Sequence, residues 1–292
     1  MTPTDKFAYY GTPELDVPNI HFKKILISCS FTWDIEKAQR LAYQWEPYGP
    51  VQIGGPAFGD HGEEFEPGLF LKKGVVITSR GCPASCSWCF VPGREGKIRE
   101  LNIGEGNIVQ DNNLLACSRN HIEKVFSMLK KQKEVDFPGG VDVLRLKDWH
   151  IELLRGIKLY QVWVAFDSDQ KKEVFRFAVE RLRKYFKIRQ VRAYVLIGYE
   201  GDTIEKAEER LRFAFEVGAL PFAMHYRTNS GDKAGSYLYS TPEWNKLRHD
   251  WTRKESIFGI MKNRRGVGAD SCTLPNPLLS PYAPAITERK TL

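Results

Sequence analysis

Three of the six cysteines of this 292-residue chain lie within eight residues, and no other sequence feature constrains its structure as strongly. The clustered cysteines are Cys82, Cys86 and Cys89, and the isolated ones are Cys29, Cys117 and Cys272. Residues 1–6 lack the basic and then apolar pattern of a secretory signal peptide, so a disulfide framework is not expected. Clustered thiols in a reducing compartment indicate a metal site instead.

The spacing of the cluster, C-x3-C-x2-C in a loop with Gly81 and Pro83, lets three thiolates converge on one metal centre. A structural zinc site takes four protein ligands, and no fourth Cys or His lies at the usual short spacing. Ferredoxin-type clusters also take four cysteines. Three ligands therefore predict a [4Fe–4S] cluster in which one iron is open to another molecule.

This stretch resembles the signature of the radical S-adenosylmethionine superfamily, in which an aromatic residue precedes the last cysteine. Trp88 takes that place in residues 81–90, and the motif follows an apolar strand at residues 75–78, as it does in the family. The resemblance covers residues 75–227.

The resemblance implies a particular chemistry. Cys82, Cys86 and Cys89 would bind three irons, and the amino and carboxylate groups of S-adenosylmethionine would chelate the fourth. An electron from a flavodoxin- or ferredoxin-type donor would then cleave S-adenosylmethionine to a 5′-deoxyadenosyl radical, which abstracts hydrogen from a substrate. The cofactor performs the difficult step, and the protein positions it and excludes water.

The family features come closest to cobalamin-type and methylthiotransferase-type relatives. Cobalamin itself is not expected, because the Asp-x-His-x-x-Gly motif is missing and residues 1–74 are too few for a complete Rossmann-like domain. Methyl transfer and methylthio transfer are therefore alternatives within the radical class, and the reaction that follows radical formation is left open.

Between residues 75 and 227, short apolar strands alternate with amphipathic helices, which predicts an α/β fold with a parallel sheet and right-handed crossovers. About six strand units suit a partial (β/α)6 barrel. We expect a small βαβ-like extension over 1–74, a radical S-adenosylmethionine core over 75–230, and an irregular, basic and aromatic extension over 231–292. Residues 97–101 are expected to form an extended arm in place of the first crossover helix.

The first cofactor candidates follow from the family resemblance. The backbone of Trp88 would face the adenine amino group. In place of the usual Gly-Gly-Glu after the second strand, the chain has Asp111, Asn112 and Asn113. Asp111 or Asn112 would bind the methionine amino group, or alternatively the two would cap the following helix.

Further cofactor candidates lie after the fourth and fifth strands. Asp167 and Ser168 match the place where the family contacts ribose or carboxylate, with a helix cap as the alternative. Gly198 and Tyr199 belong to a stretch that resembles the family's fifth-strand motif, where the glycine would let adenine approach the backbone.

Candidate substrate contacts lie toward the C-terminus. His225 and Arg227 end the sixth predicted strand, although a lone histidine is more often structural. Arg264 and Arg265, next to Lys262, form the densest positive cluster of the tail. They would contact phosphates, or would simply be solvated while the tail aromatics pack across the open barrel.

The net charge of +7 and the pI near 9.0 favour an anionic partner, although many basic proteins never bind nucleic acid. No apolar run is long enough for a membrane span, so we expect a cytoplasmic protein without a membrane partner. The leading hypothesis is a radical enzyme. Its substrate is not identified by the sequence, and the positive charge favours a nucleic acid or a nucleotide-like molecule. The rival from another class is a metal-binding, nucleic-acid-binding module. The sequence assigns no oligomeric state.

Overall fold

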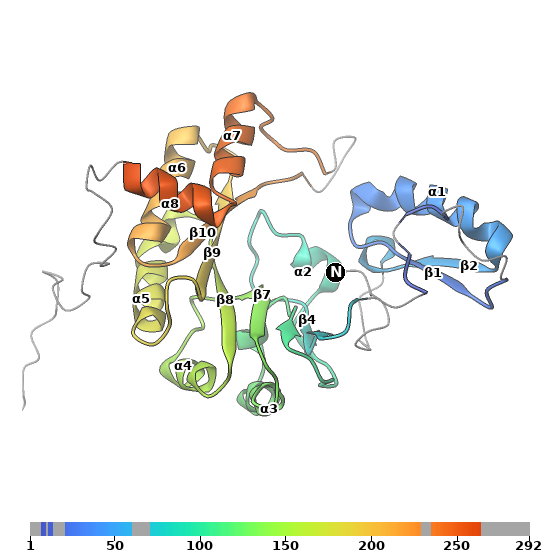
Figure 1. The fold of residues 1–292 in the computed structure, drawn as a ribbon, viewed down its shortest axis with the longest axis horizontal. Coiled ribbons are helices and arrows are strands. Elements are labelled where there is room, and N and C mark those ends of the chain that lie inside the picture. The colour runs from blue at the N-terminus through green and yellow to red at the C-terminus, as the bar shows by residue number, and fades with distance from the viewer. Residues whose placement is uncertain (1–6, 10, 14–20, 60–70, 229–234, 264–292) are drawn as a thin grey trace, which may run out of the picture.

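A six-stranded parallel sheet forms the centre of the computed structural model, which describes residues 7–9, 11–13, 21–59, 71–228 and 235–263. The strand order is β10-β9-β8-β7-β6-β3 (Figure 1). The strands are β3 (Val75–Val76), β6 (Ile108–Val109), β7 (Val135–Val141), β8 (Leu159–Phe166), β9 (Val191–Ile197) and β10 (Leu220–His225). The spatial order follows the chain, so each crossover joins neighbouring strands.

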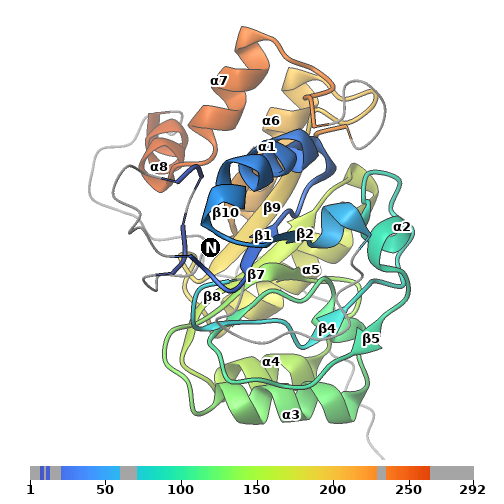
Figure 2. The same cartoon turned by 90° about the vertical axis from the view of Figure 1, so that its right-hand side faces the viewer.

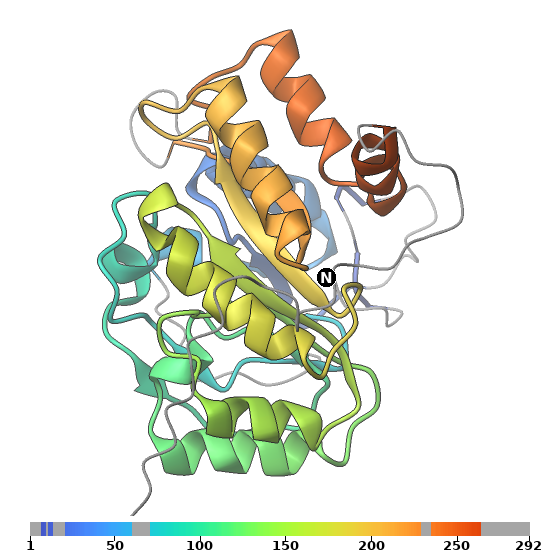
Figure 3. The same cartoon turned by 90° about the vertical axis from the view of Figure 1, so that its left-hand side faces the viewer.

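One face of this sheet is covered by helices that connect its strands (Figure 3). They are α3 (Arg119–Leu129), α4 (Asp148–Arg155), α5 (Lys172–Arg183) and α6 (Ile204–Glu216). Right-handed crossovers that all step in one direction place their helices on one face. The opposite face is thereby left for other parts of the chain to cover.

The hydrophobic core lies between the sheet and these helices. Val162, Val164 and Phe166 of β8 are fully buried in the same cluster as Phe175 and Leu182 of α5. The rings of Phe166 and Phe175 stack with centroids 4.5 Å apart. From Val162 onward, every second residue of β8 thus points into the helical layer, as the pleat of a strand requires.

The predicted α/β class is confirmed, and so is a parallel sheet of about six strand units. Curvature of this sheet into a partial barrel stays a prediction. Among the helices of the described residues, none combines the length and the apolarity needed to cross a bilayer. Five short 3-10 helices complete the regular structure described: Thr32–Asp34, Glu46–Tyr48, Pro56–Phe58, Leu114–Ala116 and Asp169–Lys171.

The first crossover lacks a long helix. Its place is taken by α2 (Val91–Glu95) and by a two-stranded antiparallel sheet of β4 (Ser79–Arg80) and β5 (Arg99–Glu100). The extended arm predicted over 97–101 is confirmed in part, because β5 lies within it. The strands β4 and β5 flank the cysteine loop on its two sides, and the segment between Cys89 and β6 is too short for a long helix with its two loops.

The N-terminal part forms a separate βαβ unit. The strands β1 (Ile25–Ser28) and β2 (Val51–Gly54) pair in parallel and are joined by α1 (Ile35–Trp45). This unit lies on the side of the central sheet opposite α3–α6 (Figure 2). Arg94 of α2 donates from Nη1 to the carbonyl oxygen of Ser30 at 2.9 Å, which ties the unit to the segment after the cysteines.

The C-terminal extension is less irregular than the sequence suggested. Its described part forms α7 (Pro242–Asp250) and α8 (Lys254–Asn263). Trp244, Leu247 and Trp251 recur at helical spacing, and all three are buried in the central core cluster. The prediction of an irregular extension is therefore wrong for residues 242–250 and 254–263, which form two helices.

The helix after β9 is capped differently from what its sequence indicates. The spacing of Asp202 and Glu205 predicts a capping box, but Thr203 is the N-cap of α6 and its hydroxyl accepts from Lys206 N–H at 3.3 Å. Asp202 instead accepts the Gly198 N–H at 2.8 Å and pairs with Arg210 at 2.6 Å. Both side chains of that pair are more than nine-tenths buried, so the pair fixes the turn that follows β9.

Replacing Asp202 with Ala is expected to lower the free energy of unfolding by about 3–5 kcal/mol, because Arg210 would remain buried without its charge partner. Asp169 provides a matched control, since it lies 3.5 Å from the same arginine but is 62% exposed. Asp169→Ala should cost less than about 1 kcal/mol. Urea unfolding of both variants checks this, and equal losses would contradict the role given to Asp202.

Candidate functional site

The cysteine loop follows β4 and is held by tight backbone contacts. The N–H of Cys82 donates to the carbonyl oxygen of Gly96 at 3.1 Å, and the N–H of Cys89 donates to that of Cys86 at 3.0 Å. Gly81 has φ +80°, and a Cβ there would overlap the carbonyl of Lys97. Glycine is therefore required where the chain enters the loop.

The three clustered cysteines are free thiols and are partly exposed. Burial raises the pKa of Cys86 and of Cys89, and Lys171 acts in the opposite direction on Cys86. Within the described residues, no three His, Cys, Asp or Glu side chains meet closely enough to hold a single metal ion. In a four-iron cluster each cysteine binds a different iron, so the three sulfurs do not meet at one point. Three thiols on one short loop are a donor set that fits such a cluster.

Two asparagines after β6 contact the cysteine loop. Asn112 accepts the Gly81 N–H on its amide oxygen at 3.1 Å. Asn113 donates from Nδ2 to the sulfur of Cys82 at 3.4 Å and to the carboxylate of Asp142 at 3.1 Å. The amide oxygen of Asn113 is buried and finds no partner within the described residues. The end of β6 therefore presents a donor to a cysteine sulfur and an unused buried acceptor.

Asp111 is almost fully buried, and both of its oxygens are occupied. They accept the Thr78 N–H at 2.6 Å, the Thr78 hydroxyl at 2.5 Å and the Ser79 hydroxyl at 2.9 Å. Burial raises the pKa of Asp111, and these hydrogen bonds oppose that effect. The predicted contact of Asp111 or Asn112 with a cofactor amino group stays a prediction. The alternative, a cap on the next helix, is not observed, since Ser118 caps α3.

The end of β8 contributes a carboxylate and a lysine. Asp167 lies 3.9 Å from Nζ of Lys171, which also lies 5.4 Å from the centre of the Trp88 ring. Burial raises the pKa of Asp167, Lys171 lowers it, and the nearby charge of Asp142 raises it further. Ser168 begins a 3-10 helix without a side-chain capping bond, so the capping alternative is not observed for it.

The end of β9 meets both the cysteine loop and β10. Tyr199 packs edge-on against Trp88, with ring centroids 5.7 Å apart, and against Tyr226 at 4.9 Å. Gly198 has φ +70°, and a Cβ there would lie 2.7 Å from the ring of His225. The predicted residues Trp88, Gly198 and Tyr199 are thus brought close together in space.

Of the predicted substrate residues, His225 and Arg227 lie at and just beyond the end of β10. The His225 ring stacks on Tyr237 at 4.3 Å and lies 5.6 Å from Trp244. Burial, and then Arg248, lowers the pKa of His225 to about 4. Arg227 donates to the Tyr237 hydroxyl at 3.0 Å. The other two predicted contacts, Arg264 and Arg265, lie outside the described residues, as does Cys272.

Sequence reasoning named Asn113 only together with Asp111 and Asn112, and it gave no individual role to Asn113, Asp142 or Lys171. Asp142 directly follows β7 and Asn113 lies four residues after the end of β6, so a search for polar residues near the ends of the parallel strands would have selected both. Lys171 has no comparable signal, because it lies within the turn that leads into α5. Its place beside Trp88 depends on the fold.

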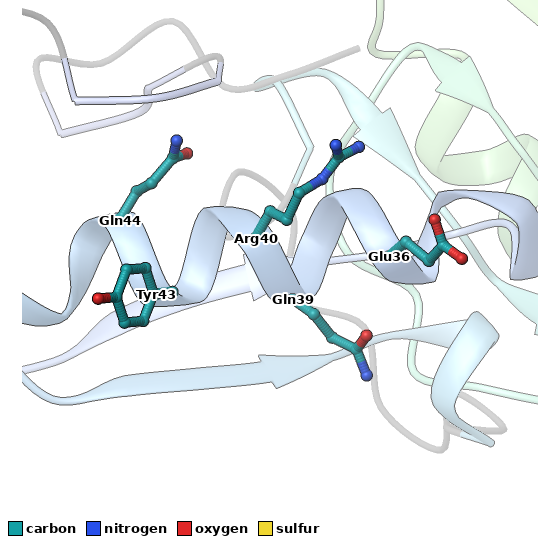
Figure 4. A pocket seen from close by; sticks show the side chains of 5 residues that line it. All are labelled: Glu36, Gln39, Arg40, Tyr43 and Gln44. Carbon is teal, nitrogen blue, oxygen red and sulfur yellow. The ribbon is translucent and has the colours of Figure 1, made fainter.

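A hollow on α1 lies outside this constellation. Figure 4 shows the side chains that line it, which project from successive turns of one helix. They are Glu36, Gln39, Arg40, Tyr43 and Gln44. A depression formed by one exposed helical face lacks converging groups from other elements, and we do not assign it a ligand.

No family model matches this chain. Over 202 residues it is 22% identical to the ribosomal protein uS12 methylthiotransferase RimO of Thermotoga sp. (strain RQ2), a match that covers 58% of this chain and 44% of that protein. The chain thus spans less than half of its relative's length. This similarity supports at most a relationship to the radical S-adenosylmethionine superfamily. It also favours an enzyme over a protein without catalytic activity.

Replacing Thr78 with Val is expected to lower the free energy of unfolding by about 2 kcal/mol, because the hydroxyl that donates to the buried Asp111 carboxylate is lost without a change in shape. Thr252→Val is the control, since that hydroxyl donates to a neutral carbonyl at an exposed position. Urea unfolding should show a loss of about 0.5 kcal/mol or less for the control. Equal effects would mean that the Asp111 contacts are not a main support of the site.

Replacing His225 with Phe should make stability less sensitive to acid. The pKa of His225, about 4 in the folded protein, lies below the ordinary value of 6.5. Between these two pH values the unfolded chain binds more protons at this residue than the folded protein does, so stability falls as pH falls. Phenylalanine keeps the ring and removes this contribution. His150 has a pKa lowered in the same way, but it is present in both proteins. Unfolding midpoints at pH 7.5 and pH 5 measure the difference, and identical losses would contradict it.

Proposed function

We propose that this protein is a radical S-adenosylmethionine enzyme whose cluster is held by Cys82, Cys86 and Cys89. The observation that carries the proposal is Asn113, whose amide group bridges the Cys82 sulfur and Asp142. Hydrogen bonds to ligating sulfurs tune iron–sulfur clusters, and an asparagine held against a cysteine in this way suits a cluster ligand. When bound, the cluster and S-adenosylmethionine would supply reductive cleavage to a carbon-centred radical.

The residues around the loop suit the methionine part of S-adenosylmethionine. The unused buried oxygen of Asn113 and the Asp142 carboxylate are acceptors for its ammonium group. Lys171 offers a cation for its carboxylate. Asn112 and Asp111 act one step away, by holding Gly81, Thr78 and Ser79 in place.

The adenosine part would lie along the aromatic edge formed by Trp88 and Tyr199. Gly198 leaves the backbone open for a close approach, and its positive φ is one that glycine adopts without strain. Asp167, whose raised pKa follows from burial, is a polar group available for a hydroxyl of the ribose. An electron donor of flavodoxin or ferredoxin type would be the required partner.

Methylthio transfer is the specific reaction favoured by the similarity to a methylthiotransferase. The two other cysteines in the described part of the chain do not add support for a second cluster. Cys29 is buried, and the pKa of Cys117 is raised to about 11 by burial, which keeps that thiol protonated. We therefore propose the radical enzyme as the main function and leave methylthio transfer to be tested by iron content.

Replacing Cys82, Cys86 or Cys89 with Ala is expected to abolish the cluster and the formation of 5′-deoxyadenosine, because two thiolates rarely hold a [4Fe–4S] cluster. The measurements are iron per chain after anaerobic reconstitution, absorbance near 400 nm, and 5′-deoxyadenosine after reduction. The parent protein should hold about four irons per chain. A Cys86→Ala protein with full iron content and full cleavage activity would overturn the proposal.

The matched control replaces Cys29, Cys117 and Cys272 together with Ala and should retain about four irons per chain. A parent with about eight irons and a control variant with about four would instead indicate a second cluster and favour methylthio transfer.

A further inference from the structure

We propose that an aromatic–arginine ladder beside the cysteine loop binds a nucleotide unit, with its base on the aromatic rings and its phosphate on two arginines. The ladder consists of Phe31, Trp33, Arg227, Tyr237 and Arg248. As an assignment of substrate class, this rests on the proposed radical enzyme. As a binding site, it can be measured on its own.

The phosphate part of the proposal rests on two arginines that share one acceptor. Arg227 and Arg248 both donate to the hydroxyl oxygen of Tyr237. Their guanidinium carbons lie 4.7 Å and 5.1 Å from the centre of the Tyr237 ring. Neither arginine forms an ion pair with a carboxylate of the described residues. Two like charges held on one phenol without a counter-ion are a site for a doubly charged or bridging anion.

The described acidic side chains near the ladder include Asp202, Glu200 and Asp34, which directly follows Trp33 in the chain. Asp202 and Glu200 contribute charge around His225 and Tyr226. Asp202 is already paired with the buried Arg210. Positive charge therefore dominates at Arg227 and Arg248, in keeping with the chain's net charge of +7.

The base part of the proposal rests on a stacked pair of rings. Phe31 and Trp33 lie parallel, with centroids 4.6 Å apart and an interplanar angle of 7°. Phe31 is 41% exposed, although its size favours burial. The Arg227 guanidinium lies 5.8 Å from the Trp33 ring and so joins this pair to Tyr237. Phe31 thus offers an exposed aromatic ring next to a cation, and proteins bind the bases of single strands by stacking them on such rings.

The ladder is assembled from distant parts of the chain. Phe31 and Trp33 come from the N-terminal βαβ unit, Arg227 follows β10, and Arg248 lies on α7. A Cβ on Gly235 would overlap the Trp33 side chain, so the N-terminal unit and the segment before α7 are in direct contact. Figure 2 shows the N-terminal unit in front of β9 and β10.

The ladder also lies close to the proposed cluster site. Trp88 of the cysteine loop contacts Tyr199, and Tyr199 contacts Tyr226, the residue just before Arg227. A molecule bound on the ladder would therefore lie next to the place proposed for S-adenosylmethionine. This proximity is what a substrate site of a radical enzyme requires.

A nucleotide accounts for both halves of the ladder. An acidic peptide would satisfy the arginines but would offer no planar ring to Phe31 and Trp33. An aromatic amino acid would stack on the rings, but it would offer the two guanidinium groups only one carboxylate to share. A phosphate linked to a base satisfies both with one ligand.

The test measures fluorescence anisotropy of a labelled ten-nucleotide single-stranded RNA on the full-length, anaerobically reconstituted protein with saturating S-adenosylmethionine, so that the cofactor's own site is filled. Arg227→Ala/Arg248→Ala should weaken binding at least about tenfold. The same double variant should reduce the salt slope by about 0.7 for each phosphate that the arginines neutralise in the parent protein. Phe31→Ala should weaken binding about fivefold or more without changing the slope.

Two control variants match these changes. Arg119→Ala/Arg155→Ala removes the same charge from exposed positions on α3 and α4, and Phe177→Ala removes a 63% exposed ring from α5. Neither should change affinity by more than about twofold. Circular dichroism melting of each variant separates loss of binding from loss of fold.

Competition identifies the source of the nucleotide. Displacement by adenosine monophosphate supports a free nucleotide, and displacement by unlabelled RNA alone supports a strand. The proposal would be overturned if inorganic phosphate or a glutamate-rich peptide displaced the labelled RNA as effectively as adenosine monophosphate or unlabelled RNA does. It is equally overturned if the ladder variants bind like their controls, or if no RNA or nucleotide binds. If the reconstituted protein binds a nucleotide but holds no iron, the nucleotide site is supported and the proposed radical function is contradicted.

Discussion

The buried carboxylate of Asp111 is the interaction on which the candidate site depends most. It accepts hydrogen bonds from Thr78 and Ser79, which lead into the cysteine loop, while its own backbone follows β6. The next two residues continue the connection, since Asn112 holds Gly81 and Asn113 holds Cys82. Three consecutive side chains thus fix a loop that has no long crossover helix to support it.

The parallel sheet explains why the remaining groups gather nearby. The carboxyl ends of neighbouring parallel strands lie at one edge, and Asp142, Asp167 and Gly198 each follow such an end. Because α3, α4, α5 and α6 cover one face, the N-terminal unit and the segment before α7 are left to meet on the other side. The same topology that builds the proposed cofactor site therefore also places the ladder beside it.

Local patterns predicted what depends on local chemistry. The alternation of strands and helices predicted the α/β class. The spacing of Cys82, Cys86 and Cys89 led to the hypothesis of a metal site. The roles of residues whose partners lie far away in the sequence could not be predicted from local patterns. Asp202 has the sequence context of a cap, yet its partner Arg210 lies on the buried face of α6, where charge pairing outweighs capping. Lys171 meets Trp88 only because β8 ends beside the cysteine loop. The helical spacing of Trp244 and Trp251 was not recognised, because charged residues lie between them in the sequence.

The contact between Gly198 and the ring of His225 has an evolutionary consequence. The histidine occupies the space that any side chain at position 198 would need, and the positive φ of the glycine adds a second restriction. The two positions therefore cannot drift independently in descendants of this chain. A lineage that replaced the histidine with a small residue would relieve the steric restriction on the glycine, whereas a lineage that first replaced the glycine would lose the stacked ring.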